Sequence, residues 1–339
     1  MLLEKYKDFL PINNKTPKIT IGEGNTPLIK SRNIGPSIGI KNLYFKLEGT
    51  NPTGSFKDRG MVMCIANAIE QKASAIICAS TGNTSASAAA FGSYFNLKTV
   101  IMVPKKGIAA GKLAQASLYG AKILAINDNF DKALSLAINL SKTTPITLVN
   151  SINPFRIEGQ KTASFEIIDS LKNLDMVCIP VGNAGNITAY WKGFKDYFKA
   201  LKTSNLPQMH GFQAKNPQTI ASAIRIKTPA SWKGALNAAQ ESNGSLKKVS
   251  DDEILEAYRL LASEEGIFCE PASAASVAGL LNISKQINLN NKTIVCIITG
   301  SGLKDPDTAL NNTNNKVIDL EASHDNLAEI LQNIHEIIK

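Results

Sequence analysis

The alternation of short apolar runs with helix-length segments is the feature that most limits how this chain of 339 residues can fold. The strand-length runs are residues 43–47, 75–79, 99–103, 122–126, 146–149, 176–180, 210–214 and 294–299. The helix-length segments among them are residues 57–72, 85–95, 109–119, 130–141 and 155–171. Strands that are apolar on both faces and separated by helices are typical of parallel sheets covered on both sides. The sequence therefore predicts an α/β fold.

Polar segments directly follow four of these apolar runs. They are Ser80-Thr81-Gly82-Asn83-Thr84, Asn150-Ser151, Gly182-Asn183-Ala184-Gly185-Asn186 and Gly300-Ser301-Gly302. Ligands of open parallel sheets bind outside the carboxyl ends of the strands. We therefore expect these segments to contribute to a common binding site.

Lys57 lies in the segment Asn51-Pro52-Thr53-Gly54-Ser55-Phe56-Lys57-Asp58-Arg59. Turn-forming residues precede Ser55, a candidate helix cap, and the helix is predicted to begin near Lys57. The positive end of a helix disfavours an ammonium group and so favours the neutral amine that a carbonyl cofactor needs. An exposed lysine in an ordinary helix start would show the same local pattern, so this segment alone leaves both interpretations open.

Two of the polar segments stand between a strand and a helix. In Gly182–Asn186, which leads into a predicted helix over residues 187–200, backbone N–H groups can close around a phosphate. This pattern is neither GxxxxGK[ST] nor GxGxxG, which argues against ATP and NAD. In residues 80–84, hydroxyl and amide groups can hold a carboxylate without a cationic side chain. A tight turn and a Ser/Thr-rich cap remain the alternatives.

The composition is that of a globular protein, with 44% hydrophobic and 19% charged residues. The net charge of +9 suits anionic ligands, whereas the spread of the lysines argues against nucleic acid. No apolar run is long enough to cross a bilayer, and the first residues lack a secretory signal, so we expect a cytoplasmic protein without a membrane partner. Five dispersed cysteines and three scattered histidines predict neither a metal site nor a disulfide framework.

The ordered set of motifs resembles the fold-type II pyridoxal-phosphate enzymes. NPTGSFKDR, STGNTS, GNAGN, CEPASAA (269–275) and TGSGLKDP (299–306) occur in that family's order. With GEGNTPL (22–28) and NSINPFRIEGQKT (150–162) added, the chain is similar to the short-chain threonine synthase family from about residue 22 to residue 310. The resemblance implies two parallel-sheet domains of the tryptophan synthase β-like class, with pyridoxal 5'-phosphate in the cleft between them. The larger domain would comprise residues 1–50 and 146–339, and the smaller inserted domain residues 51–145.

The resemblance also implies roles for particular residues. Lys57 would form the Schiff base with the cofactor and move protons on the substrate. Asn83 would bind the cofactor's 3-oxygen, and Thr299 would face the pyridine nitrogen, where a neutral hydroxyl makes the ring a more moderate electron sink than a carboxylate would. The residues implied to bind the cofactor phosphate are Gly182, Asn183, Ala184, Gly185 and Asn186. Those implied to bind the substrate are Ser80, Thr81 and Thr84 at its carboxylate, and Asn150, Ser151 and Arg156 at its phosphate.

For Arg156 the physical chemistry agrees with the resemblance, because a guanidinium fork matches a phosphate. The alternative is a surface salt bridge between Arg156 and Glu158 or another carboxylate. The final stretch, residues 326–338, has helical spacing of its apolar residues and is predicted to be a packing helix.

The implied activity is a lyase reaction of threonine biosynthesis, in which O-phospho-L-homoserine and water give L-threonine and phosphate. The resemblance implies a homodimer. A threonine or serine dehydratase remains an alternative, although such enzymes usually have a run of glycines where this chain has Asn183, Ala184 and Asn186, and need no phosphate pocket. A non-catalytic small-molecule sensor on the same fold is the other alternative, against which the presence of Lys57 weighs.

Overall fold

The computed structural model describes residues 1–105, 110–313, 331 and 334. The chain divides into two compact units, residues 1–306 and 307–339. Both sheets belong to the first unit. The helix expected over residues 326–338 lies outside the described residues, apart from Leu331 and Ile334.

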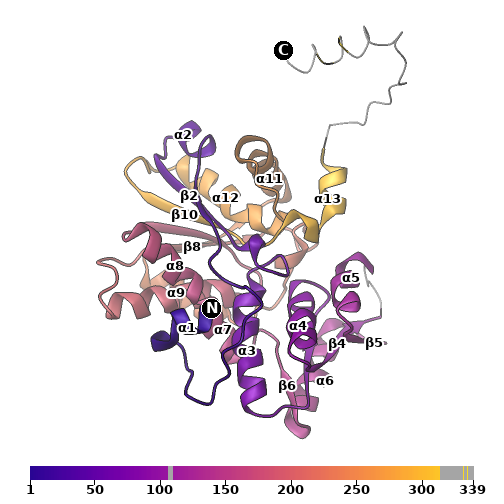
Figure 1. Ribbon diagram of the computed structural model, residues 1–339. Helices are drawn as coiled ribbons and strands as arrows, with labels where there is room; N and C mark the ends of the chain where they lie inside the picture. The colour runs from indigo at the N-terminus through magenta and orange to yellow at the C-terminus, as the bar shows by residue number, and fades with distance from the viewer. Residues whose placement is uncertain (106–109, 314–330, 332–333, 335–339) are drawn as a thin grey trace. The chain divides into compact units, whose positions relative to one another are not determined.

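A six-stranded sheet forms the larger part of the first unit (Figure 1). In spatial order its strands are β1 (Leu28–Lys30), β2 (Asn42–Leu47), β10 (Thr293–Ile298), β7 (Met176–Pro180), β8 (Gln208–Ala214) and β9 (Ser245–Val249). All neighbours are parallel except β1, which pairs antiparallel with β2. Every residue of β7 is buried, as expected of a central strand covered on both faces.

Helices cover both faces of this sheet. They are α8 (Thr162–Leu171), α9 (Gly185–Lys199), α10 (Trp232–Glu241), α11 (Asp251–Glu265) and α12 (Pro271–Ser284). Figure 1 shows α11 and α12 on one side of the sheet and α8 and α9 on the other. Helix α11 has clear start and stop signals, because Ser250 and Glu253 form a capping box and Gly266 ends the helix with a φ of +66°. Shorter helices are α1 (Leu2–Lys5), α2 (Ile34–Ser37) and α13 (Pro306–Asn311).

A four-stranded sheet, parallel throughout, forms the other part of the first unit. Its spatial order is β5 (Lys122–Ile126), β4 (Lys98–Pro104), β3 (Ala75–Ala79) and β6 (Ile146–Leu148). The accompanying helices are α3 (Lys57–Glu70), α4 (Asn83–Tyr94), α5 (Ala110–Leu118) and α6 (Phe130–Thr143). Helices α4 and α6 both pack against β3 and β4, so the central strand β3 is fully buried.

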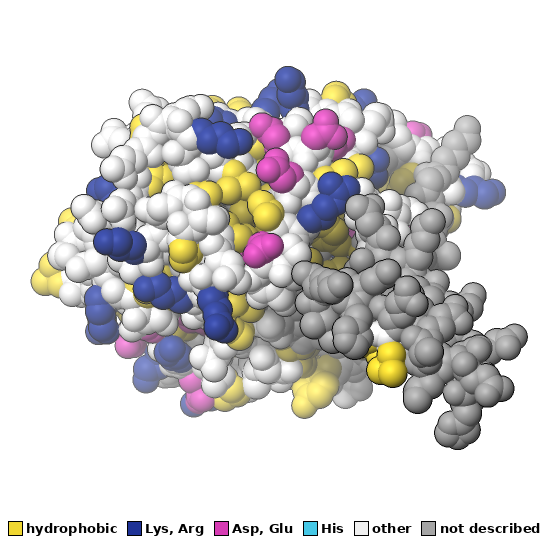
Figure 2. All heavy atoms as spheres, turned by 90° about the horizontal axis from the view of Figure 1, so that it is seen from above, with side chains coloured by type: hydrophobic (Ala, Val, Ile, Leu, Met, Phe, Trp, Pro, Cys, Tyr) yellow, Lys and Arg dark blue, Asp and Glu magenta, His cyan; other side chains and the backbone are white. Residues whose placement is uncertain are grey.

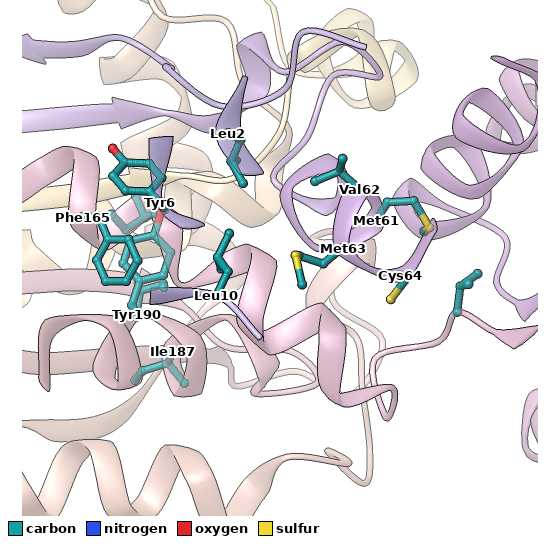
Figure 3. Close-up of a cluster of buried hydrophobic side chains, with 14 of the residues drawn as sticks. Leu2, Tyr6, Leu10, Met61, Val62, Met63, Cys64, Phe165, Ile187 and Tyr190 are labelled. Atoms are coloured by element: carbon teal, nitrogen blue, oxygen red, sulfur yellow. The ribbon is translucent and has the colours of Figure 1, made fainter. Parts of the chain in front are cut away.

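Helix α3 packs closely against α7 (Pro154–Gln160), and this contact links the start of α3 to the segment that carries Arg156. A Cβ at Gly159 would lie 1.9 Å from the carbonyl oxygen of Arg59, so only glycine permits the approach. Beside this contact, Met61 and Cys64 of α3 belong to the same apolar core as Tyr6 and Phe165 (Figure 3). The core thereby fixes α3 from several sides.

The predicted α/β fold with two parallel sheets is confirmed, while three local expectations are wrong. The edge strands β1 and β9 were not expected, because both lack a continuous apolar run. The single helix expected over residues 155–171 is two helices, α7 and α8, which meet at Lys161. Helix α3 begins at Lys57 as expected, but Phe56 occupies the N-cap position; the Ser55 hydroxyl accepts only a long hydrogen bond, 3.4 Å, from the Lys57 N–H.

A buried cluster of charges joins β2, α3 and α8. Arg59 pairs with Glu48 at 2.6 Å and with Glu166 at 2.7 Å, and Lys46 pairs with Glu166 at 2.7 Å. Burial alone would raise the pKa of Glu166, but the Arg59 and Lys46 charges outweigh burial and hold this pKa at about 2. Removing one member of such a buried cluster leaves its partners unpaired, which is strongly destabilising.

We therefore expect Glu166→Gln to lower the free energy of unfolding by about 3 kcal/mol or more at neutral pH. Because the folded-state pKa is lowered, the stabilisation by Glu166 is present above the ordinary glutamate pKa and is lost as the pH falls towards 2. Urea unfolding of wild type and variant between pH 7 and pH 3 measures both effects, and the difference between the two proteins should shrink on acidification. Glu70→Gln, at a half-buried carboxylate that accepts hydrogen bonds from Asn13 and Thr16 and forms no ion pair among the described residues, is the control and should lower the free energy of unfolding far less. Equal losses in the two variants would contradict the structural role of the cluster.

Candidate active site

A cleft of about 1200 Å³ collects the polar segments that follow the strands. All fourteen residues singled out from the sequence line it. They are Lys57, Ser80, Thr81, Asn83, Thr84, Asn150, Ser151, Arg156, Gly182, Asn183, Ala184, Gly185, Asn186 and Thr299. They come from the ends of strands in both sheets and from the helices that follow, as expected for parallel sheets.

Lys57 opens α3 at the wall of the cleft, where its ammonium nitrogen lies 4.2 Å from the centre of the Phe56 ring. Burial lowers the pKa of Lys57 to about 7, with the Arg156 charge acting in the same direction and Glu270 against it. Near neutral pH, Lys57 is therefore a neutral, nucleophilic amine in a large fraction of the protein molecules. The next residue, Asp58, anchors the turn by accepting hydrogen bonds from Thr53 and Ser87.

The loop before α9 leaves the first turn of that helix open to a ligand. Ala184 occupies the N-cap position with a left-handed φ of +63°, and no side chain caps the helix. Both polar atoms of the Asn186 side chain are buried and have no partner among the described residues. Asn183 is already engaged, because it donates to Ser151 and accepts from the Ala230 N–H. Free helix N–H groups and an unpartnered amide form a cradle for an anion.

The loop before α4 has the same character. Gly82 is the N-cap residue of α4, and no side chain caps this helix either. The Ser80 hydroxyl accepts from the Gly82 N–H at 3.2 Å, while Thr81 and Thr84 line the cleft. Hydroxyl groups and uncapped helix N–H groups therefore line the cleft on the side of the four-stranded sheet. The cradle at α9 offers the same kinds of donor on the side of the six-stranded sheet.

Arg156 is fully buried at the wall of the cleft. Its Nη1 donates to the carbonyl of Val149 at 2.9 Å, but Nε and Nη2 have no partner among the described residues. The surface salt bridge with Glu158 is not formed, because Glu158 pairs with Lys161 and Lys192. A buried guanidinium with two unsatisfied nitrogens is costly unless an anion joins it.

Asn150 differs from its neighbours, because its side chain is engaged by backbone. Its amide accepts from the Ala79 N–H and donates to the Ala79 carbonyl, both at 2.9 Å. Asn150 thus ties the end of β6 to the end of β3. The polar side chain of Ser151, which accepts from Asn183, links this segment to the cradle at α9.

Among the further residues that line the cleft are the charged side chains Glu270 and Lys304, which the sequence analysis did not single out. Glu270 accepts hydrogen bonds from Asn83 at 2.9 Å and from Thr299 at 3.2 Å. Lys304 donates to Gln115 of α5, and burial lowers its pKa. Glu270 lies in CEPASAA and Lys304 in TGSGLKDP, so both motifs were recognised without these side chains being assigned a role.

The arrangement suits a ligand that has both a carbonyl group and a phosphate. Lys57 supplies an amine able to attack a carbonyl, and the cradle at Asn186 supplies donors for a phosphate. The two unpaired nitrogens of Arg156 can bind a second anion. Among the described residues no group of His, Cys, Asp or Glu is arranged to hold a metal ion, and all five cysteines are buried and free.

Lys and Arg side chains are scattered over the face in Figure 2, interspersed with acidic and uncharged groups. Within the described part of the chain, no helix combines the length and apolar character needed to cross a bilayer.

Comparison with known proteins identifies relatives over most of the chain. Residues 19–300 match the family described as pyridoxal-phosphate dependent enzyme. A threonine synthase of Halalkalibacterium halodurans is 55% identical over 91% of this chain and 91% of its own. The threonine synthase of Bacillus sp. is 51% identical, covering 99% of this chain and 98% of its own, and that of Methanocaldococcus jannaschii is 45% identical, covering 97% and 87%.

Solved structures of the same fold are more distant in sequence. A maize serine racemase has a TM-score of 0.74 at 18% identity and covers 98% of this chain and 97% of its own. The processed threonine deaminase isoform 2 of Solanum lycopersicum has a TM-score of 0.74 at 22% identity, covering 92% of each chain. These likenesses support the fold alone.

Proposed function

Because the chain belongs to the pyridoxal-phosphate-dependent enzymes, we propose that it is a threonine synthase, converting O-phospho-L-homoserine and water to L-threonine and phosphate. The relatives named threonine synthase support this proposal. The observation that carries it is the buried, incompletely paired guanidinium of Arg156 in the cleft that also contains Lys57. The cofactor's own phosphate has a separate cradle at α9, so Arg156 is left for a phosphate on the substrate.

The proposed roles divide the cleft into three parts. Lys57 holds the cofactor, Asn83 and Thr299 contact its ring, and the loop of residues 182–186 holds its phosphate. Residues 80, 81 and 84 bind the substrate's carboxylate. Ser151 and Arg156 bind the substrate's phosphate, and Asn150, which is bonded to Ala79, holds that segment against β3.

The cofactor supplies a carbonyl that bonds to amines and a ring that accepts electrons from the substrate's carbon atoms. Lys57 removes the proton from the α-carbon and transfers protons at the β- and γ-carbons, which its pKa of about 7 permits near neutral pH. Arg156 holds the γ-phosphate and stabilises its charge as the carbon–oxygen bond breaks. Water then supplies the hydroxyl at the β-carbon, so the products are threonine and phosphate.

A threonine or serine dehydratase is the second candidate, since it would need the same lysine. The substrates of that reaction carry no phosphate, which would leave Arg156 buried without a partner. Phosphate release from O-phosphohomoserine, measured beside homoserine, serine and threonine, tests the proposal. We expect phosphate and threonine from O-phosphohomoserine; rapid formation of 2-oxobutyrate from threonine, without phosphate release from O-phosphohomoserine, would refute it.

We also propose a cytoplasmic homodimer with an inserted smaller domain, on the basis of the family resemblance. Residues 1–50 and 146–339 would form the larger domain and residues 51–145 the smaller. Because β6 (Ile146–Leu148) pairs with β3, the second boundary falls more naturally just after β6. Light scattering of the purified protein tests the dimer.

The cradle at α9 can be tested at Gly185, where a Cβ would meet nothing closer than 3.6 Å. Gly185→Ala therefore fits and is the matched control. Gly185→Asp adds a negative charge beside the cofactor phosphate, and we expect it to weaken cofactor binding at least about tenfold relative to the alanine variant. Fluorescence titration of cofactor-free protein measures this affinity, and equal affinities for the two variants would argue against the cradle.

A further inference from the structure

Glu270 is a buried carboxylate that touches both side chains proposed to flank the cofactor ring. One of its oxygens accepts from the Asn83 amide at 2.9 Å, and the other accepts from the Thr299 hydroxyl at 3.2 Å. Asn83 opens α4 beside the four-stranded sheet, whereas Thr299 follows β10 of the six-stranded sheet. Glu270 therefore joins the two walls of the cleft.

The surroundings of Glu270 fix its position closely. A Cβ at Gly300 would lie 2.6 Å from the Glu270 carboxyl carbon, so glycine is required there. The Glu270 N–H donates to the Gly300 carbonyl at 3.0 Å, and the Gly300 N–H donates to the Ser273 hydroxyl at 3.0 Å. Ser273 in turn lies 2.9 Å from the Thr299 hydroxyl. These bonds form a continuous chain from Glu270 through Gly300 and Ser273 to Thr299.

The direction of the hydrogen bonds follows from the chemistry of the partners. An ionised carboxylate can only accept, so the Thr299 hydroxyl proton points to Glu270. Thr299 then has an oxygen lone pair, and no proton, for a group on its other side. The Asn83 amide has a second N–H, which remains available to an oxygen in the cleft.

We propose that Glu270 is a positioning residue, which turns the Thr299 hydroxyl so that its lone pair faces the cofactor's pyridine nitrogen and thereby favours the protonated ring. This inference rests on the proposed placement of the ring between Asn83 and Thr299. It modifies the expectation that a neutral hydroxyl at Thr299 makes the ring a moderate electron sink, because a carboxylate accepts the proton of this hydroxyl.

Other charges act on the same carboxylate. Burial raises the pKa of Glu270, while the hydrogen bonds from Asn83 and Thr299 and the charges of Lys304 and Lys57 oppose this rise. The neighbouring Cys269 thiol has its pKa raised by burial and by Glu270, so it stays neutral. A neutral Gln at position 270 would keep the shape but would turn its amide N–H groups toward Thr299, whose own proton would then be free for the ring.

The test is the titration of the ring nitrogen in protein loaded with ¹⁵N-labelled cofactor, followed by NMR without substrate. In Glu270→Gln we expect the pKa of that nitrogen to fall by about one unit or more. Glu265→Gln is the matched control, because Glu265 accepts hydrogen bonds from Ser31 and from backbone N–H groups outside the cleft. Its titration should equal that of wild type. A purely structural role for Glu270 would lower the melting temperature or cofactor affinity and leave the midpoint unchanged, and that result would overturn the proposal.

A second pair of variants acts through Thr299. Thr299→Ser keeps the hydroxyl and should keep the wild-type titration, whereas Thr299→Val should lower the midpoint. Adding Glu270→Gln to Thr299→Val should then produce a smaller shift than Glu270→Gln alone. If Glu270→Gln fails to fold or to bind cofactor, identical titrations of the serine and valine variants overturn the proposal. Attachment of the cofactor to a lysine other than Lys57 would instead show that the proposed site itself is wrong.

Discussion

Lys57→Ala is expected to abolish covalent attachment of the cofactor and to reduce turnover by at least about ten-thousandfold, since we propose that this one side chain both anchors the cofactor and carries protons. Borohydride reduction fixes the bond between cofactor and lysine, and mass spectrometry of the digested protein then locates it. Wild type should carry the adduct on Lys57, and the variant should carry none. Attachment to cofactor-free wild type should also accelerate as the pH rises through about 7, because only the neutral amine reacts.

Lys304 provides the control for this experiment. It lines the same cleft, and burial lowers its pKa as it does for Lys57. Lys304→Ala should nevertheless retain the adduct on Lys57, because the first turn of α3, anchored through Asp58, presents Lys57 to the cleft. An adduct on Lys304 in wild type would refute the assignment of Lys57.

The sequence predicts the strands that are buried on both faces of a sheet. Strands β3 and β7 are buried at every residue, so their sequences are continuous apolar runs and stand out without any other information. Strand β9 is a sheet edge with exposed lysines and shows no such run. The break between α7 and α8 has no strong local signal either. Gly159, just before this break, is needed for the close contact with Arg59, which lies 100 residues earlier in the sequence, so its role is visible only in the folded structure.

The site was predictable to the extent that it lies at strand ends. The sequence order of the motifs brought Lys57, the loop before α9 and Arg156 to one expected cleft, and the structure places them there. What the sequence could not reveal is which polar atoms are already engaged. Asn150 is bonded to Ala79 at both ends of its amide, whereas two nitrogens of Arg156 are left over. That distinction depends on the pairing of β6 with β3 and so on three-dimensional structure.

Arg156→Leu is the variant that best separates the two candidate reactions. Losing the guanidinium fork proposed to hold the substrate's phosphate dianion should lower kcat/KM for O-phosphohomoserine by about a hundredfold or more, with cofactor attachment to Lys57 intact. Arg156→Lys should restore only part of this loss, because lysine offers a point charge without the fork. Steady-state kinetics on O-phosphohomoserine and on threonine measure both effects. If the protein is a dehydratase, Arg156→Leu should deaminate threonine about as fast as wild type does, and its kcat/KM should show no loss specific to a phosphorylated substrate.

Arg225→Leu is the matched control, since Arg225 is an exposed arginine that lines the same cleft. Arg225→Leu should lower kcat/KM far less than Arg156→Leu does, and its effect should fade with added salt, because exposed charges are screened.

The melting temperature of Arg156→Leu separates a binding role of Arg156 from a structural one. Arg156 is buried without an ion pair among the described residues, so leucine there should leave the melting temperature of the ligand-free protein unchanged or raise it. Inorganic phosphate should raise the melting temperature of cofactor-loaded wild type more than that of Arg156→Leu, because a ligand stabilises the folded state that binds it. If Arg156→Leu loses stability but keeps its kcat/KM for O-phosphohomoserine, Arg156 is a structural residue, held by its bond to Val149 and not for a substrate.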